Sequence, residues 1–449
     1  MACSSLPWHS LPTEMKFSIL DHLDISEVRA FATLSKESYT LSIPSIWRNV
    51  EIKSYEALQA YLGSVPAQYG RYTRQLTLCT KSVDDGPYSR AIDARAATQS
   101  VIALLVQCPQ VEHLSLNLYG SLTPDVIPVF PTLRELTDLK IANAADEAHL
   151  PLNERLVVSI AASVANVRRL SLDRIARSVI HAPELIGVCP FVPVADSDDD
   201  IPAHPLLGTE LSLPSLLRLP TLKSLRIRDT HLGDANWADV PVHCALEFLD
   251  LGSCYFESQD FNRICTERIV ANVGHSVGEF SLNTAITGES IHFAKPQETP
   301  LKHLRKIHLT PLFPVDNVVD TLTTLSGSPV EELSVRCYED DVADVCAALE
   351  DFLNLRVERG DAALYQHLKE IVVDAVHDVD DDASNEARAR VADALPEEQA
   401  TALKRFQDFW NDIRFGRETK AASGIAGEAR GSTDKCPTDA PCTYTTLES

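Results

Sequence analysis

A short unit of the form apolar-x-x-apolar-x-apolar recurs along most of this chain and constrains its fold more than any other feature. Its copies begin at Val111, Leu136, Val167, Leu222, Leu246, Val277, Leu304, Val330 and Leu368, and a degenerate first copy carries Leu76 and Leu78. Each copy fits a short strand, because residues two apart lie on one face of a strand. Apolar stretches at 97–106, 155–165 and 342–353 supply helices. One such unit cannot cover its own apolar face, so the units must stack.

The spacing of the units is typical of leucine-rich repeats. From Leu225 to Leu333, the central apolar residues follow one another at 24, 31, 27 and 26 residues, in or near that period. Prolines that can end the preceding helix stand before several units: Pro109, Pro131, Pro220, Pro300 and Pro329. Residues 72–376 therefore predict an α/β fold, with parallel strands on a concave face and helices outside. Only Cys254, and in part Thr230, fits the polar consensus position after the strand, so the predicted solenoid is irregular and its repeat count stays open.

Two segments interrupt or follow the array. The longest gap, between Leu170 and Leu225, contains a Pro-rich acidic stretch at 190–205, which we interpret as an insertion or an exposed loop. Residues 383–416 predict C-terminal capping helices. The main one spans 397–415 and carries the stripe Leu403, Phe406, Trp410 and Ile413, with partner binding as the alternative. Residues 417–449 have little apolar content and are expected to be disordered.

Residues 8–50 follow a different pattern, that of three short helices. Met15, Ile19, Leu20 and Leu23 recur at helical spacing, and we expect them on one face of the first helix. Asp24 and Glu27 form the pattern of a capping box for the second helix, and the third should end before Pro44. Three short helices bury too little surface to be stable alone. The rest of the chain or a partner must therefore cover part of their apolar set.

This N-terminal segment resembles the F-box family. The resemblance lies in Leu11-Pro12, Glu14, Ile19-Leu20, Leu23, Val28, Phe31, Leu34-Ser35 and Trp47-Arg48. In that family, such a segment docks on a Skp-type adaptor, which is carried by a cullin–RING scaffold. The resemblance implies that the partner-contacting residues here are Leu11, Pro12, Ile19, Leu20, Leu23, Leu34 and Trp47, whereas Val28 and Phe31 are expected in the core. An F-box segment followed by a repeat array is similar to F-box proteins that bear leucine-rich repeats.

Sequence motifs of catalysis and of cofactor or metal binding are absent from the chain. It has no phosphate-binding loop, nucleophile elbow, HExxH helix or dinucleotide-binding turn, and no CxxC pair. We expect Cys79, Cys108, Cys254 and Cys337 to be buried structural thiols, and the unpatterned cysteines indicate a cytoplasmic or nuclear compartment. The net charge of −24 disfavours nucleic acid. The acidic runs 196–200 and 378–382 are interpreted as solvated loops, and no apolar run reaches membrane-spanning length.

The function expected from these features is that of a non-catalytic adaptor, which recruits a target protein on the repeat face to a ubiquitin ligase. The alternative is a leucine-rich-repeat scaffold unconnected with ubiquitin, in which the N-terminal helices only cap the first repeat. The two differ in one observable. An adaptor should leave Leu11, Pro12, Leu20 and Leu23 at least partly exposed, whereas a cap should pack them against the first repeats.

Overall fold

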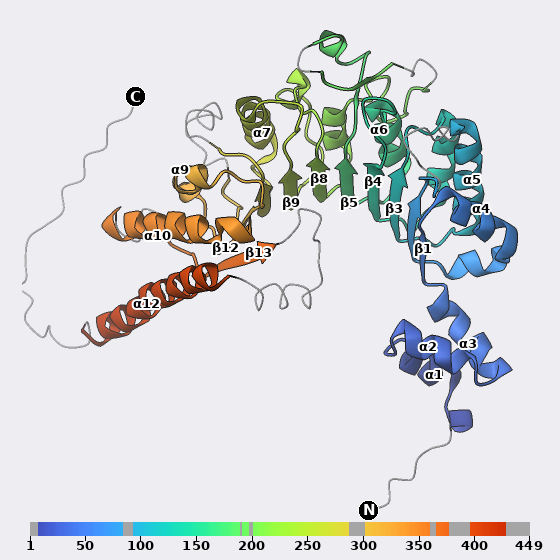
Figure 1. Cartoon of the computed structure of the whole chain (residues 1–449), viewed down its shortest axis with the longest axis horizontal. Helices are drawn as coiled ribbons and strands as arrows, with labels where there is room; N and C mark the ends of the chain where they lie inside the picture. Colours follow the sequence, from blue (N-terminus) through green and yellow to red (C-terminus); the bar gives the residue numbers. More distant parts are fainter. Residues whose placement is uncertain are drawn as a thin grey trace, which may run out of the picture.

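A computed structural model describes residues 8–83, 93–188, 191–196, 201–286, 301–359, 365–376 and 396–427. Figure 1 shows three parts in chain order: a small helical module at the N-terminal end, a long curved sheet with helices along its outer side, and a long helix beside the last strands. The sheet is the centre of the molecule, and it determines where the other parts lie.

The sheet contains eleven strands within the described residues, and its spatial order follows their order in the chain. Every neighbouring pair is parallel. The strands are β1 (Asn49–Ile52), β2 (Gln75–Cys79), β3 (His113–Leu118), β4 (Asp138–Asn143), β5 (Arg169–Asp173), β8 (Ser224–Arg228), β9 (Phe248–Leu251), β10 (Glu279–Leu282), β11 (Lys306–Leu309), β12 (Glu332–Tyr338) and β13 (Glu370–Val376). Strands added one after another, each against its predecessor, make a solenoid. The chain is a mixed α/β protein with a leucine-rich-repeat-like solenoid.

The strand register explains why the repeated unit predicts the fold. Leu114, Leu139, Leu170 and Leu225 are lateral partners in four successive strands, and each is at most 2% exposed. Their strand neighbours alternate to the opposite side, which faces the inner side of the arc. Stacking thus merges the apolar faces of all repeats into one continuous core, which runs from Val50 to Trp410. All ten predicted strand units are confirmed.

Helices on the outer side connect the strands (Figure 1). The α-helices are α4 (Tyr55–Ser64), α5 (Ala94–Gln107), α6 (Glu154–Ser163), α7 (Gln259–Val273), α9 (Val318–Thr324) and α10 (Val342–Arg359). Other connections use 3₁₀ helices: η2 (Ala67–Tyr72), η3 (Pro124–Thr132), η5 (Leu213–Arg218), η6 (Ala235–Trp237), η7 (Val315–Asn317), η8 (Leu325–Gly327) and η9 (Glu339–Asp341). Proline explains part of this choice. Pro128 and Pro131 lie inside η3, where they remove backbone donors that an α-helix needs.

The sheet begins earlier than residue 72, where the sequence predicts its start. β1 pairs with β2 and adds Val50 and Ile52 to the core, so the predicted boundary between the two parts is wrong. The sequence signal was weak, because β1 offers only two inward side chains and lacks the full unit.

The excursion between β5 and β8 is an ordered insertion over its described residues, which supports the first of the two interpretations, an insertion or an exposed loop. Its described residues include η4 (Pro183–Leu185) and a two-stranded parallel sheet of β6 (Arg177–Ser178) and β7 (Val194–Ala195). Ile201 and Leu207 are buried in the main core. Residues 189–190 and 197–200, which include most of the first acidic run, lie outside the described residues, as does the second run at 378–382.

Polar side chains that follow the strands bond to backbone groups at two offsets: Thr230 stands at the consensus position, whereas Thr80 and Asn143 stand one residue earlier. Thr80 accepts a hydrogen bond from the Tyr119 amide at 2.8 Å, and Thr230 accepts one from the Ile175 amide at 3.1 Å. Asn143 is fully buried, accepts from the Ala145 amide and donates to the Leu150 carbonyl. A strict offset after the last strand leucine therefore misses Thr80 and Asn143, because the offset varies between repeats.

The last helix, α12 (Glu397–Gly427), packs on α10 and covers the C-terminal end of the core. Phe406 and Trp410 are buried, and the predicted stripe is completed by the partly buried Leu403 and Ile413. The Gln399 side chain accepts from the Ala343 amide at the start of α10. The helix continues beyond residue 416, so the predicted disordered tail begins too early; residues 377–395 and 428–449 lie outside the described residues.

Candidate partner-binding surfaces

The N-terminal helical module consists of residues 8–48. It contains η1 (Trp8–Ser10), α1 (Thr13–Leu20), α2 (Ile25–Ala32) and α3 (Lys36–Ile46). The predicted capping box at the start of α2 is present: Asp24 accepts from the Glu27 amide, and Glu27 accepts from the Asp24 amide. α3 continues through Pro44 to Ile46, so its predicted end is wrong. Pro44 stands in the last turn, where its missing amide costs one hydrogen bond without ending the helix.

The interior of the helical module is small. Its buried apolar side chains are Leu20, Val28, Ala32 and Leu41. Lys16 is also buried, with its ammonium 2.9 Å from Glu37 Oε1 and over the ring of Trp8. A core of this size stabilises a domain only weakly.

Large apolar side chains on the surface are concentrated in this module. Of the 17 exposed ones among the described residues, five belong to it: Met15, Ile19, Ile25, Leu34 and Tyr39. Leu34 is the most exposed of the five at 73%, directly after α2. The module is about a tenth of the chain, so its surface is unusually apolar. Exposed apolar surface of this kind marks an interaction site.

The predicted single apolar face of α1 is wrong. Met15 and Ile19 lie one turn apart and are 52% and 40% exposed, whereas Lys16 and Leu20, also one turn apart, are buried. Helical geometry separates the two pairs onto adjoining strips. The inner strip builds the module, and the outer strip remains available to a partner.

The seven residues assigned to partner contact divide into three groups. The first group lies at the surface: Pro12, Ile19 and Leu34 are exposed, and Leu11 and Leu23 are half-buried. Leu20 alone forms the second group, because it is 1% exposed, packs in the module interior and presents no surface for contact.

Trp47 belongs to a third group, because it packs against the first repeat. Its ring stacks on Tyr69 at 5.5 Å and meets Tyr61 edge-on at 6.0 Å. Tyr69 is also hydrogen-bonded to Tyr39 of α3. Trp47 therefore connects the module to the solenoid, and because it is only partly buried, its contact with a partner stays a prediction.

The second open surface is the concave face, made of the outward side chains of the strands. Across β2–β9 these line a groove of about 420 Å³. Two lateral rows cross it. One row places Ser115, Lys140, Ser171 and Arg226 side by side, and the other places His113, Asp138, Arg169 and Ser224 side by side. Sequence alone predicts that these positions face outward, but the pairing of one repeat with the next comes from the register.

Ion pairs between neighbouring strands order the arginines of this face. Arg169 is bonded to Asp138, whose carboxylate also lies 3.2 Å from His113. Burial opposes the charge of Asp138, but the bond from Arg169 and a bond from Thr137 hold the pKa of Asp138 below its ordinary value. Asp250 lies 2.8 Å from Arg226 and 2.9 Å from Arg228, and it is fully buried beneath them.

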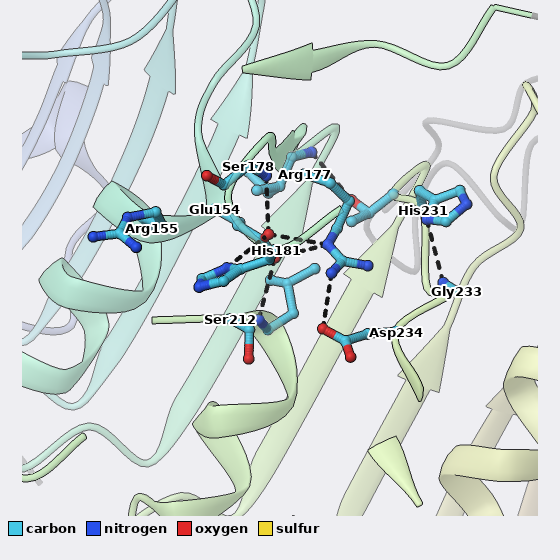
Figure 2. Close-up of polar contacts among 12 residues, drawn as sticks. Glu154, Arg155, Arg177, Ser178, His181, Ser212, His231, Gly233 and Asp234 are labelled. Atoms are coloured by element: carbon cyan, nitrogen blue, oxygen red, sulfur yellow. Dashed lines mark hydrogen bonds and ion pairs between the residues drawn. The ribbon is translucent and has the colours of Figure 1, made fainter. Parts of the chain in front are cut away.

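A buried polar cluster joins the excursion to the solenoid, and no sequence motif indicates it. Figure 2 shows that Glu154, the first residue of α6, is hydrogen-bonded to Arg177 and His181, and that Arg177 also donates a hydrogen bond to Asp234. The distances are 3.0 Å from Arg177 Nε, 3.1 Å from His181 Nδ1, and 2.8 Å from Arg177 Nη2 to Asp234. The amide of Ser178 donates to Glu154 as well. Arg177, Ser178 and His181 come from the excursion and Asp234 comes from the segment after β8, so the cluster fixes the path of the chain outside the sheet.

The surroundings of Glu154 favour its charged form. Burial opposes ionisation of Glu154, but the His181 hydrogen bond, the Arg177 charge and the Ser178 amide hold the pKa of Glu154 below its ordinary value. Burial, together with the charge of Arg177, lowers the pKa of nearby His231 to about 4, so that imidazole is neutral. Because folding lowers the pKa of Glu154, this carboxylate stabilises the folded state at neutral pH, and the contribution is lost as the pH falls through its folded-state pKa.

Glu147 has the opposite behaviour, at the rim of the concave face. It is 5% exposed, accepts a hydrogen bond from the Tyr255 hydroxyl at 3.4 Å, and lies near Arg174 and Asp229. Both neighbours adopt left-handed backbone, at φ 53° and 46°, where β5 and β8 turn outward. Burial raises the pKa of Glu147 to about 7.

Glu147→Gln is expected to change how stability depends on pH. A carboxyl with a raised folded pKa stabilises the fold below its ordinary value of 4.5, and this contribution is lost as the pH rises through about 7. Glutamine stays neutral, so the variant should match the wild type at acidic pH and be more stable by about 1 kcal/mol in weak alkali. Urea unfolding at both pH values measures this, with the exposed Glu247→Gln as control. Equal differences at both pH values would contradict it.

Burial affects most of the described thiols. All seven described cysteines are free. Burial raises the pKa of Cys108 to about 11, and of Cys254 and Cys337 to about 12, as expected of structural thiols. Cys79 differs from its prediction, because it is only half-buried at the end of β2.

Searches for a metal site and a membrane span give no candidate. The part of the chain that the structure describes contains no group of three or more His, Cys, Asp or Glu side chains arranged to hold a metal ion. Within the same residues, every helix is too short or too polar to span a bilayer.

Comparison with known proteins adds little to these observations. No protein-family model matches the sequence, and no curated protein matches it. Among solved structures, the chain is similar to the leucine-rich repeat-containing protein LegL7 from Legionella pneumophila, with 15% sequence identity and a TM-score of 0.32, over 68% of this chain and 98% of that one. The fold assignment rests on the strand order and register of the chain itself.

Proposed function

We propose that this protein is a non-catalytic adaptor, in which the helical module docks on a Skp-type adaptor of a cullin–RING ubiquitin ligase and the concave face holds a target protein. The observation that carries the proposal is the surplus of exposed apolar side chains on a module with a very small core of its own. Binding a partner would cover that surface and stabilise the module at the same time. The resemblance of residues 11–48 to the F-box pattern specifies the partner.

The alternative is a protein-interaction scaffold unconnected with ubiquitin. The packing of Trp47 on Tyr69 favours it in part, because the module does cap the first repeat. That contact uses only the end of α3, however. Ile19 and Leu34 remain exposed, which a cap alone does not require.

Binding to a recombinant Skp-type adaptor tests the proposal directly. Ile19→Asp combined with Leu34→Asp should weaken binding at least tenfold, because buried apolar anchors dominate the energy of such interfaces. Both side chains are exposed in the free chain, so the fold should be unaffected. Isothermal titration calorimetry on the full chain measures the affinity.

The matched control places the same charges on other exposed apolar residues, as Val106→Asp with Ile264→Asp on α5 and α7. This variant should bind like the wild type. A wild-type chain that fails to bind at micromolar concentration, or a control that binds as weakly as the module variant, would favour the scaffold.

A further inference from the structure

We propose that the groove across β2–β8 binds an extended, carboxylate-rich segment of the target protein. This inference rests on the proposed function only in assigning target capture to the concave face. It concerns the chemistry of the captured segment, which neither the F-box resemblance nor the repeat pattern specifies.

The solvent-facing charges of the groove are positive. Lys140 is exposed on β4, and the side chains of Arg169 and Arg226 are 61% and 30% exposed. The acidic partners lie deeper, because the side chains of Asp138 and Asp250 are 19% and 0% exposed. These carboxylates hold the guanidinium groups in place from the neighbouring strands. A ligand entering from the solvent would therefore meet cationic donors before it met any carboxylate.

Short side chains between the cations leave room for a peptide backbone. Ser115 and Ser171 flank Lys140 in its lateral row, and Ser224 follows Arg169 in the other row. These short, half-exposed hydroxyls leave room above the strands and can both donate and accept hydrogen bonds. Phe248 closes the groove on the β9 side with an aromatic surface.

The spacing of the cations favours several carboxylates over one anionic group. Lys140 and Arg226 are separated by one strand, so their backbones are about 10 Å apart. On one face of an extended peptide, side chains recur about every 7 Å. A segment crossing the strands could thus present successive acidic side chains to successive cations. A single phosphate would instead need cations converging on one point.

The remainder of the concave face makes the groove selective. In the row that carries Asp138 and Arg169, the outward positions of β10 to β13 are Glu279, Lys306, Glu332 and Glu370, and Lys306 is paired with Glu332. This part of the face carries more carboxylates than cations, so it attracts an acidic segment less than β4–β8 does. The chain carries a net charge of −24, so the cationic groove is a local exception. The overall negative charge disfavours the binding of long nucleic acids.

Fluorescence anisotropy with the full chain tests this inference, without any ligase subunit. The probe is a labelled twelve-residue peptide of alternating glutamate and serine, beside the same peptide with glutamine for glutamate. Lys140→Glu should weaken binding of the glutamate peptide roughly tenfold, because one attraction becomes a repulsion. The control Lys302→Glu makes the same change in net charge at an exposed position before β11 and should have little effect. Thermal melting of both variants verifies folding.

The inference would be overturned if the glutamate peptide did not bind up to millimolar concentration, or if the glutamine peptide bound with equal affinity. Equal weakening by Lys302→Glu would also overturn it, as would binding that occurs only when serine in the glutamine peptide is phosphorylated. Tighter binding of polyuridine RNA than of the glutamate peptide would also reject it. Because no Skp-type adaptor is present, failure here leaves the docking experiment on the helical module unaffected, and failure there leaves this one unaffected.

Discussion

Replacement of Glu154 by alanine should lower the free energy of unfolding by about 3–5 kcal/mol, the typical cost of removing one partner of a buried ion pair. Glu154 is fully buried and accepts from Arg177, His181 and the Ser178 amide. Its loss leaves Arg177, which is 2% exposed, with one carboxylate partner in place of two. Urea denaturation followed by circular dichroism measures the change.

Two further variants determine whether the effect comes from the buried charge. Lys223→Ala removes an ion pair to Glu247 that is half-exposed and should cost at most about 1 kcal/mol. Adding both Arg177→Met and Asp234→Asn to Glu154→Ala should recover part of the stability, because together they remove the buried arginine and the carboxylate that its loss would leave without a charged partner. A Glu154→Ala variant as stable as Lys223→Ala would show that the cluster contributes little.

Trp410→Ala is the second substitution with a large expected effect. Trp410 is 7% exposed between α12 and the end of the core, and truncating a buried tryptophan costs about 3–5 kcal/mol. Much of this cost should fall on the docking of α12, because that helix contacts the solenoid along one stripe only. The expected result is rapid tryptic cleavage within α12, at Lys404 and Arg405, under conditions where the wild-type helix is protected.

The control for this experiment is Arg405→Ala, on the same helix. It removes the paired hydrogen bonds from Arg405 to Glu350, at 3.0 and 3.2 Å, on an exposed face. Cleavage at Lys404 should then stay slow. If Trp410→Ala remained as resistant as this control, packing of the tryptophan would not be what holds α12.

The strands of this protein are predictable because each repeat carries the same local signal. Leu170 and Leu172 alternate with Arg169 and Ser171, and that alternation alone identifies a half-buried strand. β1 carries only Val50 and Ile52, and tertiary pairing with β2 determines its conformation. The same holds for β6 and β7, which have two residues each.

The surfaces were less predictable than the strands, for a physical reason. Ile19 and Leu20 lie on adjoining strips of α1, but which of the two faces inward depends on where α3 packs. Trp47 likewise satisfies the F-box pattern, and only the fold places it against Tyr69. In the Glu154 cluster, the bond between Arg177 and Asp234 joins residues 57 positions apart, so no local pattern could indicate it.

The stacked rings of Trp47 and Tyr69 have a mechanical consequence. They lie where the end of α3 meets the first repeat, and Figure 1 shows the strands extending from there to the far end of the molecule. A small rotation about this contact would move the distant repeats through a large arc. The size of the side chain at Tyr69 would then set the direction in which the repeats point. That direction would determine the distance between a partner bound to the module and a target held in the groove.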